Sequence, residues 1–368
     1  MIGGMSTSRA ASLLVSLALA GLVLAFQPAV GADEAPAAQA ASAPANLLYP
    51  GEERHLSNVR QLTFAGENAE AYFSFDGQMI SFQSNRAHAC DQIYTMKVDG
   101  SDVRMVSTGL GRTTCSHFTP DGKSVVYAST HLGGPECPPV PSSDMGYVWP
   151  IYDTYDIFKV NIDGTGLTRL TDTPGYDAEA TVGKDGRIVF TSTRDGDMEI
   201  YSMNGDGSDV RRLTNRPGPD GGPFFSADGS KIVWRGRAYA PGADLDNYFS
   251  LLKQGIWRPT ALEIFVMDRD GSNVRQVTDT GVGANWAPFF TPDGTRIIYG
   301  SNAANPRSNN FDLFMVDIDG GNKEQVTFFD GFDGFPMFSP DGTKLVFGSN
   351  RNQAKEGDTN VFVAGWKN

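Results

Sequence analysis

Residues 336–342 read PMFSPDG, and the Asp341-Gly342 pair at the end of this stretch lies between two apolar runs. An Asp-Gly pair in this setting is a strong signal for a β-hairpin, because glycine adopts a positive φ without steric cost. The same kind of turn occurs five more times earlier in the chain. Its aspartates, in order, are Asp76, Asp121, Asp185, Asp228, Asp293 and Asp341. We therefore predict six copies of one hairpin unit.

Each copy continues in a similar way after its hairpin. A third strand follows, as at Ile93-Tyr94, and in five copies it runs into a second Asp-Gly turn and a fourth strand such as residues 167–171. The sixth third strand, residues 361–366, ends with the sequence, whereas residues 59–63 form a fourth strand that no third strand precedes. We therefore predict that the two ends of the chain pair in one sheet, which leaves no open sheet edge.

The predicted fold is all-β: a six-bladed β-propeller of four-stranded antiparallel blades, closed by pairing of the N-terminal strand with the C-terminal blade. The propeller is expected to occupy residues 58–368. A four-stranded blade needs about 40–45 residues, and the second and fourth copies are longer than that. The surplus falls between their second and third strands, as insertions at residues 131–155 and 237–261.

The N-terminus has the pattern of a secretory signal. Arg9 precedes an apolar or small run at residues 11–26, which is shorter than the about 20 residues that span a bilayer, and small residues end the segment at Ala32. We predict a cleaved signal peptide at residues 1–32, with an uncleaved anchor as the alternative, and a flexible Ala/Pro-rich lead-in at 33–57. The mature protein is then periplasmic or secreted and does not span the membrane.

Composition limits the class of partner. The chain carries 30 basic and 43 acidic residues, a net charge of −13, and its 42 glycines and 21 prolines accompany 40% hydrophobic residues. Such a balance is typical of a turn-rich globular protein and disfavours a helical bundle or disorder. It also argues against nucleic acid as a partner, because neutralising phosphates needs an excess of Lys and Arg.

A column of oxygen-bearing side chains stands eight residues before the turn aspartates. Its members are Asn68, Thr113, Asp177, Asp220, Asn285 and Asp333. Since each innermost strand begins there, we expect these side chains at the mouth of the channel, with Glu70 and Glu179 two residues further in. His117 and Trp286 on the same strands are further candidates. One interpretation is a Ca²⁺ site using Asp177, Asp220 and Asp333; the other is capping of the connecting turns.

The sequence offers two further sets of candidate binding residues. Basic residues near the end of the second strand are expected to pair with nearby carboxylates, or else to capture an anion: Arg86, His131, Arg194, Arg237 and Arg351. Aromatic residues of the insertions are candidates for a recognition rim, because loops on rigid scaffolds commonly bind partners. They are Trp149, Tyr152, Tyr248 and Trp257, and the alternative is that the insertions are lids packed on neighbouring blades.

Three cysteines are too few for a disulfide scaffold, but an oxidising compartment permits one bridge. Ala128 is expected opposite Cys115 in its hairpin, and Cys137 starts a loop that can fold back, so Cys115–Cys137 is the expected pair. Zinc binding by these cysteines with nearby histidines and small buried thiols remain the alternatives.

The PxFSPDG, Ile-Tyr-x-Met-x-x-Asp-Gly and Val-Arg-Gln-Leu-Thr motifs resemble the TolB-like propeller repeat, also called WD40-like or PD40, over residues 58–368. The resemblance implies a periplasmic or secreted propeller that is often a protein-binding platform. In the Tol–Pal system the propeller docks the peptidoglycan-associated lipoprotein. Only residues 33–57 would precede the propeller, so we expect no counterpart of the N-terminal domain of true TolB.

The chemistry-bearing motifs of common enzymes are missing from the sequence. It has no Gly-x-Ser-x-Gly elbow and no complete P-loop. We therefore expect a non-enzymatic platform, without a cofactor, that binds an envelope protein or polymer at its loop-rich face. The alternative is a metal-dependent polysaccharide lyase or another carbohydrate-active propeller enzyme, since some TolB-like propellers resemble oligogalacturonate lyases. Its metal would need His88, His117 and His131, and Glu70 with Glu179 would be a candidate carboxylate pair.

Overall fold

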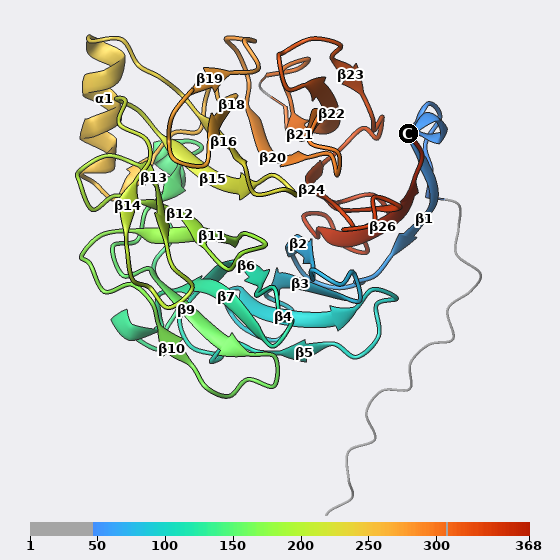
Figure 1. The fold of residues 1–368 in the computed structure, drawn as a ribbon, viewed down its shortest axis with the longest axis horizontal. Helices are drawn as coiled ribbons and strands as arrows, with labels where there is room; N and C mark the ends of the chain where they lie inside the picture. Colours follow the sequence, from blue (N-terminus) through green and yellow to red (C-terminus); the bar gives the residue numbers. More distant parts are fainter. Residues whose placement is uncertain (1–46, 307) are drawn as a thin grey trace, which may run out of the picture. The chain divides into compact units, whose positions relative to one another are not determined.

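Six four-stranded antiparallel sheets stand around a central axis in the computed structural model, which describes residues 47–306 and 308–368 (Figure 1). The innermost strands of neighbouring blades contact one another around the axis. The predicted six-bladed β-propeller is therefore confirmed. The predicted signal peptide, residues 1–32, and residues 33–46 of the predicted lead-in lie outside the described residues. None of the helices within the described ranges has the length and apolarity that crossing a membrane requires.

The blades share one layout. In blades 1 to 5 the first strand in chain order is innermost and the fourth has only two residues, whereas in blade 6 β24 is innermost and β1, the first in chain order, is outermost. Blades 1 to 3 consist of β2 (Asn68–Phe73), β3 (Met79–Ser84), β4 (Gln92–Lys97) and β5 (Arg104–Met105); β6 (Thr113–Phe118), β7 (Ser124–Ser129), β9 (Asp156–Asn161) and β10 (Thr168–Arg169); and β11 (Asp177–Val182), β12 (Ile188–Ser192), β13 (Glu199–Met203) and β14 (Arg211–Arg212). Blades 4 to 6 consist of β15 (Asp220–Phe225), β16 (Lys231–Gly236), β18 (Glu263–Asp268) and β19 (Arg275–Gln276); β20 (Asn285–Phe290), β21 (Arg296–Ser301), β22 (Asp312–Asp317) and β23 (Glu324–Gln325); and β24 (Asp333–Phe338), β25 (Lys344–Ser349), β26 (Asn360–Trp366) and β1 (Leu56–Gln61).

Blade 6 closes the ring with both ends of the propeller. Strand β1 pairs antiparallel with β26, with Leu56 opposite Trp366, and the two strands lie side by side in Figure 1. This pairing confirms the predicted closure. It also satisfies the backbone groups that an open sheet edge would leave exposed.

The last part of the predicted flexible lead-in is folded instead. Residues 52–54 form the 3-10 helix η1 (Glu52–Arg54), and Glu52 is fully buried against Arg351 of blade 6. Leu47 and Leu48 pack on the apolar core of the same blade. The prediction of flexibility was wrong for residues 47–57. It rested on the alanine- and proline-rich composition of the residues before them, whereas the ion pair between Glu52 and Arg351 joins this segment to the ring.

The residues that recur in each blade form hydrogen bonds that hold its turns and strands together. In the hairpin turn, the hydroxyl two residues before the aspartate donates to its carboxylate, as from Ser339 to Asp341 at 2.6 Å. This bond and the backbone N–H of Thr343 lower the pKa of Asp341 to about 2. The threonine that ends the fourth-strand motif, Val-Arg-Gln-Val-Thr at residues 274–278, bonds to the start of the third strand, as in the 2.6 Å bond from Thr278 to Glu263.

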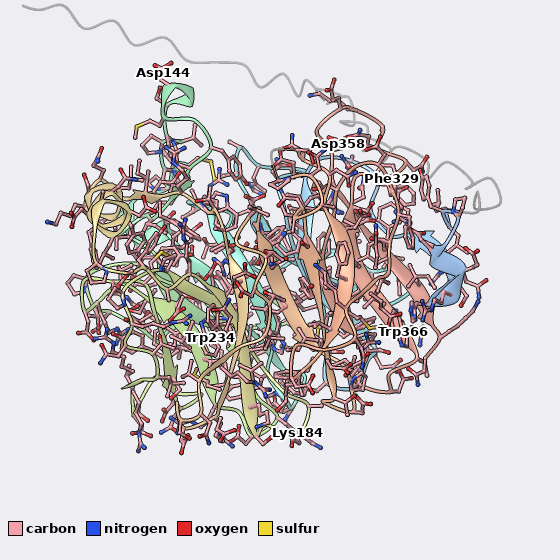
Figure 2. The ribbon with its side chains drawn as sticks, turned by 90° about the horizontal axis from the view of Figure 1, so that it is seen from above. Asp144, Lys184, Trp234, Phe329, Asp358 and Trp366 are labelled. Atoms are coloured by element: carbon pink, nitrogen blue, oxygen red, sulfur yellow. A yellow bond between two sulfur atoms is a disulfide. The ribbon has the colours of Figure 1, made fainter. Side chains whose placement is uncertain are left out.

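The ring has two different faces, which Figure 2 shows edge-on. We call the face that carries the first-to-second-strand turns the turn face; Lys184 marks it. The opposite face, marked by Asp144, carries the blade-to-blade connections and both insertions, and we call it the insertion face.

The two insertions meet on the insertion face. The segment between β7 and β9 contains η2 (His131–Gly133), η3 (Ser143–Met145) and β8 (Trp149–Pro150). The segment between β16 and β18 contains helix α1 (Ala243–Leu252) and β17 (Ile256–Trp257). Strand β17 pairs antiparallel with β8, so a two-residue ribbon joins the insertions of blades 2 and 4.

Candidate functional site

A β-bulge interrupts every innermost strand at its third residue. The register with the second strand shifts there in all six blades, and the third residue has a positive φ, such as 51° for Glu70 and 56° for Glu179. Bulges redirect side chains and are frequent beside binding sites. We call the six third residues the bulge ring; they are Glu70, Cys115, Glu179, Gly222, Ala287 and Phe335, and all six line one cavity on the axis.

Two residues further along the same strands, a layer of side chains closes the channel. Phe224 of blade 4 reaches Tyr72 of blade 1, across the axis, with ring centroids 5.2 Å apart, and it also packs on Phe289 at 5.3 Å. His117 lies beside both Tyr72 and Phe224, and burial lowers its pKa to about 4. We call this layer the plug. It makes the channel two separate cavities rather than an open pore.

The cavity between the plug and the insertion face is small and mixed in character. It has a volume of about 60 Å³, above the roughly 10–15 Å³ that a cavity needs to hold one water. We call it the chamber. The bulge ring lines it together with Tyr72, Trp149, Thr181, Phe224, Arg235 and Trp286. The cavity on the turn face is larger, about 240 Å³, and is lined mostly by apolar residues.

Glu179 and Arg235 form the charged wall of the chamber. The guanidinium donates to Oε1 of Glu179 at 2.6 Å, while Oε2 accepts bonds from the Thr191 hydroxyl at 2.7 Å and the Gly222 N–H at 2.8 Å. Burial alone would raise the pKa of Glu179, but the charge and hydrogen bonds of Arg235 outweigh it and lower that pKa. Arg235 also lies over the rings of Trp149 and Trp257, at 5.4 and 5.8 Å.

A glycine pair makes room for this ion pair. A Cβ on Gly221 would lie 2.6 Å from Oε2 of Glu179, and one on Gly222 would lie 2.4 Å from Nη1 of Arg235. The sequence analysis missed Arg235. Two adjacent glycines within the predicted innermost strand were the available signal, because glycine in a strand often marks a close approach of another group.

Glu70 faces the same chamber but differs from Glu179 in its hydrogen bonding and in its pKa. Its Oε2 is buried and accepts no hydrogen bond within the described part of the chain. Burial, and the nearby charge of Glu179, raise the pKa of Glu70 to about 7, although the Cys115 thiol opposes the shift by hydrogen bonding. Two neighbouring carboxyl groups therefore differ in protonation near neutral pH, with Glu179 ionised and Glu70 close to half-protonated.

The six residues that were expected at the channel mouth lie elsewhere. Each begins an innermost strand, but none exposes more than 1% of its surface. Three of them pair with a nearby arginine: Asp177 with Arg194 at 2.9 Å, Asp220 with Arg216 at 2.6 Å, and Asp333 with Arg351 at 2.7 Å. Asn68 donates to the carbonyls of Ala65 and Gly66, as the turn-capping interpretation expects. The bulge two residues later, not the start of the strand, directs side chains to the axis.

The predicted basic column follows this pattern in part. Arg194 and Arg351 pair with the aspartate that begins the innermost strand of their blade, and Arg237 lies 3.7 Å from the exposed Asp244. Arg86 donates instead to the uncharged Asn68 and Ser84, and His131 lies 2.8 Å from the Ser129 hydroxyl. In blade 4 the neighbouring Arg216 takes the place of the column residue. It can do so because Gly236 ends the second strand there, and a Cβ on Gly236 would lie 2.2 Å from the Asp220 carboxylate.

The aromatic residues of the insertions pack largely against the protein, as the lid interpretation expects, and do not form an exposed recognition rim. Tyr248 and Trp257 expose only 3% and 1% of their surface. The Tyr248 hydroxyl donates to Asp197 at 2.6 Å, and Trp257 packs on Trp149 with centroids 5.4 Å apart. The prediction of a recognition rim was therefore wrong for Tyr248 and Trp257. Trp149 and the half-buried Tyr152 remain partly accessible.

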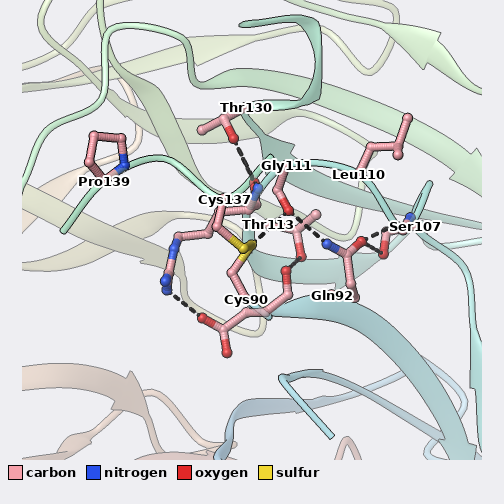
Figure 3. Close-up of a disulfide and its surroundings, with 12 residues drawn as sticks. Cys90, Gln92, Ser107, Leu110, Gly111, Thr113, Thr130, Cys137 and Pro139 are labelled. Atoms are coloured by element: carbon pink, nitrogen blue, oxygen red, sulfur yellow. Dashed lines mark hydrogen bonds and ion pairs between the residues drawn. A yellow bond between two sulfur atoms is a disulfide. The ribbon is translucent and has the colours of Figure 1, made fainter. Parts of the chain in front are cut away.

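The disulfide joins Cys90 to Cys137, and Cys115 is a free, buried thiol (Figure 3). The predicted Cys115–Cys137 pair was wrong. The bulge turns Cys115 towards the channel axis, whereas Cys90 lies between β3 and β4, where the insertion of blade 2 folds back onto blade 1. In Figure 3 the bridge lies beside Gly111 and Thr113, at the junction of these two blades.

Removing this bridge is expected to lower the free energy of unfolding by about 2–4 kcal/mol, because it closes a long loop in the unfolded chain. Denaturant unfolding with and without reductant measures the loss. A Cys115→Ala variant is the control, and reduction is expected to destabilise it as much as the unaltered protein. A Cys115→Ala protein that is insensitive to reductant would show that Cys115 belongs to the bridge.

The metal-ligand sets considered from the sequence do not assemble. Among residues 47–306 and 308–368, no three His, Cys, Asp or Glu side chains lie together as a metal would require. Asp177, Asp220 and Asp333 each face an arginine, not one another. His117 belongs to the plug, whereas His131 packs on Phe158 in its own blade with centroids 4.4 Å apart. The geometry therefore offers neither the Ca²⁺ interpretation nor a histidine-bound metal a set of ligands.

The six four-stranded blades around one axis define a six-bladed β-propeller. No family model matches the chain. The uncharacterised protein Atu1656 of Agrobacterium fabrum (strain C58) is 31% identical over 237 residues, covering 63% of this chain and 69% of that protein. The chain belongs to the same family as Atu1656.

Solved structures agree on the fold. A putative TolB from Agrobacterium tumefaciens aligns over 86% of this chain and 99% of its own, with 19% identity and a TM-score of 0.56. TolB from Acinetobacter baumannii aligns over 72% of this chain with 20% identity and a TM-score of 0.54, and the match spans only 55% of that TolB chain. An oligogalacturonate lyase from Vibrio parahaemolyticus, 13% identical, aligns over 83% of this chain and 93% of its own with a TM-score of 0.50.

Proposed function

We propose that the protein is an exported, non-enzymatic propeller whose insertion face binds a protein of the cell envelope. The observation that carries this proposal is the set of large apolar side chains exposed on that face. They come from the first insertion and from a blade connection, and include Phe64 at 65%, Leu132 at 57%, Val140 at 72% and Tyr147 at 71% exposure. Exposed apolar groups that gather on one face typically mark a protein-binding surface, and Leu132, Val140 and Tyr147 all belong to the first insertion.

A groove between the two insertions supports the same surface. It has a volume of about 750 Å³, within the range of about 300–1,000 Å³ common for ligand sites. Val140 and Ile151 of the first insertion face Phe249 and Leu252 of the second across it. Apolar side chains thus stand on both sides of the groove beside the charged Asp153 and Lys253, and such a mixed lining suits the side chains of a protein partner.

Export is supported by two independent features. Residues 1–32 have the sequence pattern of a cleaved secretory signal. The Cys90–Cys137 disulfide is of the kind that persists in oxidising compartments such as the periplasm. We therefore propose a periplasmic or secreted location.

Chemical crosslinking of the protein in an envelope extract tests the proposal. Val140→Asp is expected to reduce the captured partner at least fivefold, because it places a charge among the apolar side chains of the groove. Val274→Asp is the matched control, since Val274 is 47% exposed beside β19 and away from the insertions. Equal capture by both variants would contradict a binding role for the insertion face.

The alternative is a carbohydrate-active enzyme, which the pair of Glu70 and Glu179 and the lyase-like fold favour. The volume of the chamber opposes it, because about 60 Å³ is far below the about 300–1,000 Å³ of ordinary small-molecule sites. An assay for unsaturated products from polyuronate distinguishes the two, and we expect no turnover.

A further inference from the structure

Glu70 is a carboxylate in the chamber that forms no ion pair within the described chain, although the Cys115 thiol hydrogen-bonds to it. Glu179 is balanced by Arg235 at 2.6 Å, whereas Oε2 of Glu70 is buried and accepts no hydrogen bond. A buried carboxylate without a counter-charge is costly, and it becomes favourable only when a cation or a donor joins it. When Glu70 is ionised, the lining of the chamber therefore carries two carboxylates, Glu70 and Glu179, but one positive side chain, Arg235.

The remaining walls of the chamber suit an organic cation. Tyr72, Phe224, Trp286, Trp149 and Phe335 line it, and aromatic faces attract ammonium groups through the ring quadrupole. Trp149 and Trp257 already hold the Arg235 guanidinium in this manner. We propose that the chamber binds a primary ammonium group at the end of a chain, with Glu70 as its carboxylate ligand.

The volume of the chamber and the groups that line it favour an ammonium group over a sugar, a nucleotide or a divalent cation. A chamber of about 60 Å³ admits a terminal group but not a whole sugar or nucleotide. A divalent cation such as Ca²⁺ needs six to eight oxygens, whereas both oxygens of Glu179 already accept hydrogen bonds. An ammonium needs only a few acceptors and gains from the aromatic walls.

The ligand would approach from the insertion face. The plug closes the other side of the chamber, and Trp149 of the first insertion forms part of the wall towards solvent. Trp149 belongs to the two-residue ribbon between β8 and β17, which few hydrogen bonds hold in place. This inference goes beyond the proposed protein-binding face, because it requires neither Val140 nor the groove between the insertions.

Isothermal titration of the purified protein with 1-aminobutane tests the site, with 1-butanol as the uncharged probe. We expect saturable binding of the amine and none of the alcohol at the same concentration. Glu70→Gln is expected to weaken amine binding at least tenfold. Glu67→Gln, the same substitution on an exposed residue three positions earlier, is the control and is expected to leave binding unchanged.

Proton release provides a second readout that needs no variant. The pKa of Glu70 is about 7, so below that pH an arriving ammonium ionises it and a proton leaves, whereas above it no proton is released. Binding is therefore expected to be about tenfold weaker at pH 6 than at pH 8. Titrations in buffers of different ionisation enthalpy measure the release. The titratable or charged groups that influence Glu70 are Cys115, Tyr72, Glu179, Arg235 and Asp91.

Three results would overturn the inference: no binding of 1-aminobutane, equal binding of 1-butanol, or unchanged affinity in a folded Glu70→Gln protein. Competition separates the two sources of the ammonium. Inhibition of partner capture by 1-aminobutane would indicate a lysine side chain of the partner, and unaffected capture would indicate a free amine. Loss of capture in Val140→Asp with amine binding intact would show that the two surfaces act independently.

Discussion

Replacing Arg351 by Met is expected to lower the free energy of unfolding by about 3–5 kcal/mol, the usual loss when a buried ion pair keeps only one partner. Arg351 is fully buried and donates to Glu52 at 2.9 and 3.0 Å and to Asp333 at 2.7 Å. Both carboxylates are themselves fully buried. Without the guanidinium they would share one apolar pocket with their charges unbalanced.

The loss should be accompanied by release of the segment before β1. Arg351 also donates to the Leu47 carbonyl at 2.9 Å, so it connects residues 47–52 to blade 6. Limited proteolysis is expected to cleave near Glu52 in the Arg351→Met protein but not in the unaltered one. Denaturant unfolding measures the change in stability.

Arg86→Met is the matched control for Arg351→Met. Arg86 occupies the same position in blade 1, but it is exposed and its partners are the uncharged Asn68 and Ser84. Its loss is expected to lower the free energy of unfolding by about 1 kcal/mol. Equal effects of the two substitutions would contradict the assignment of Arg351 as the residue that holds the closure of the ring.

Replacing Arg235 by Met is expected to have the second large effect, a loss of about 3 kcal/mol. The substitution leaves Glu179 in the chamber with its hydrogen bonds from Thr191 and Gly222 but without a counter-charge. The pKa of Glu179, now held below its usual value mainly by Arg235, should rise.

A double-mutant cycle separates the ion pair from the packing of the arginine on the two tryptophans. Adding Glu179→Gln to Arg235→Met is expected to recover part of the lost stability, because it removes the unbalanced charge. Thermal or denaturant unfolding of the four proteins gives the coupling. Strictly additive effects would show that Arg235 contributes through its contacts with Trp149 and Trp257 alone.

The repeating pattern was sufficient to predict the architecture, because hairpin turns and strand alternation are local. The Asp-Gly turns, the third strands and the fourth strand without a neighbour predicted the blades and their closure, and the pairing of β1 with β26 confirms it. The same alignment placed Glu70 and Glu179 inside the channel, two residues beyond the start of their strands.

The residues that contact Glu70 and Glu179 could not be predicted from the local sequence pattern. Arg235 pairs with Glu179 from 56 positions away and from the second strand of the next blade. The disulfide partner of Cys137 and the burial of Trp257 likewise depend on how blades 1, 2 and 4 approach one another. Each of them depends on contacts between segments far apart in the sequence, which a local pattern does not contain.

The amino-acid sequence alone determined the number of blades, the closure of the ring and the position of the insertions, since turn chemistry and apolar alternation act over a few residues. Only the tertiary structure decided which side chains meet on the axis. The reason is the bulge in each innermost strand, which turns its third residue towards the axis and leaves Glu70 facing a chamber assembled from all six blades.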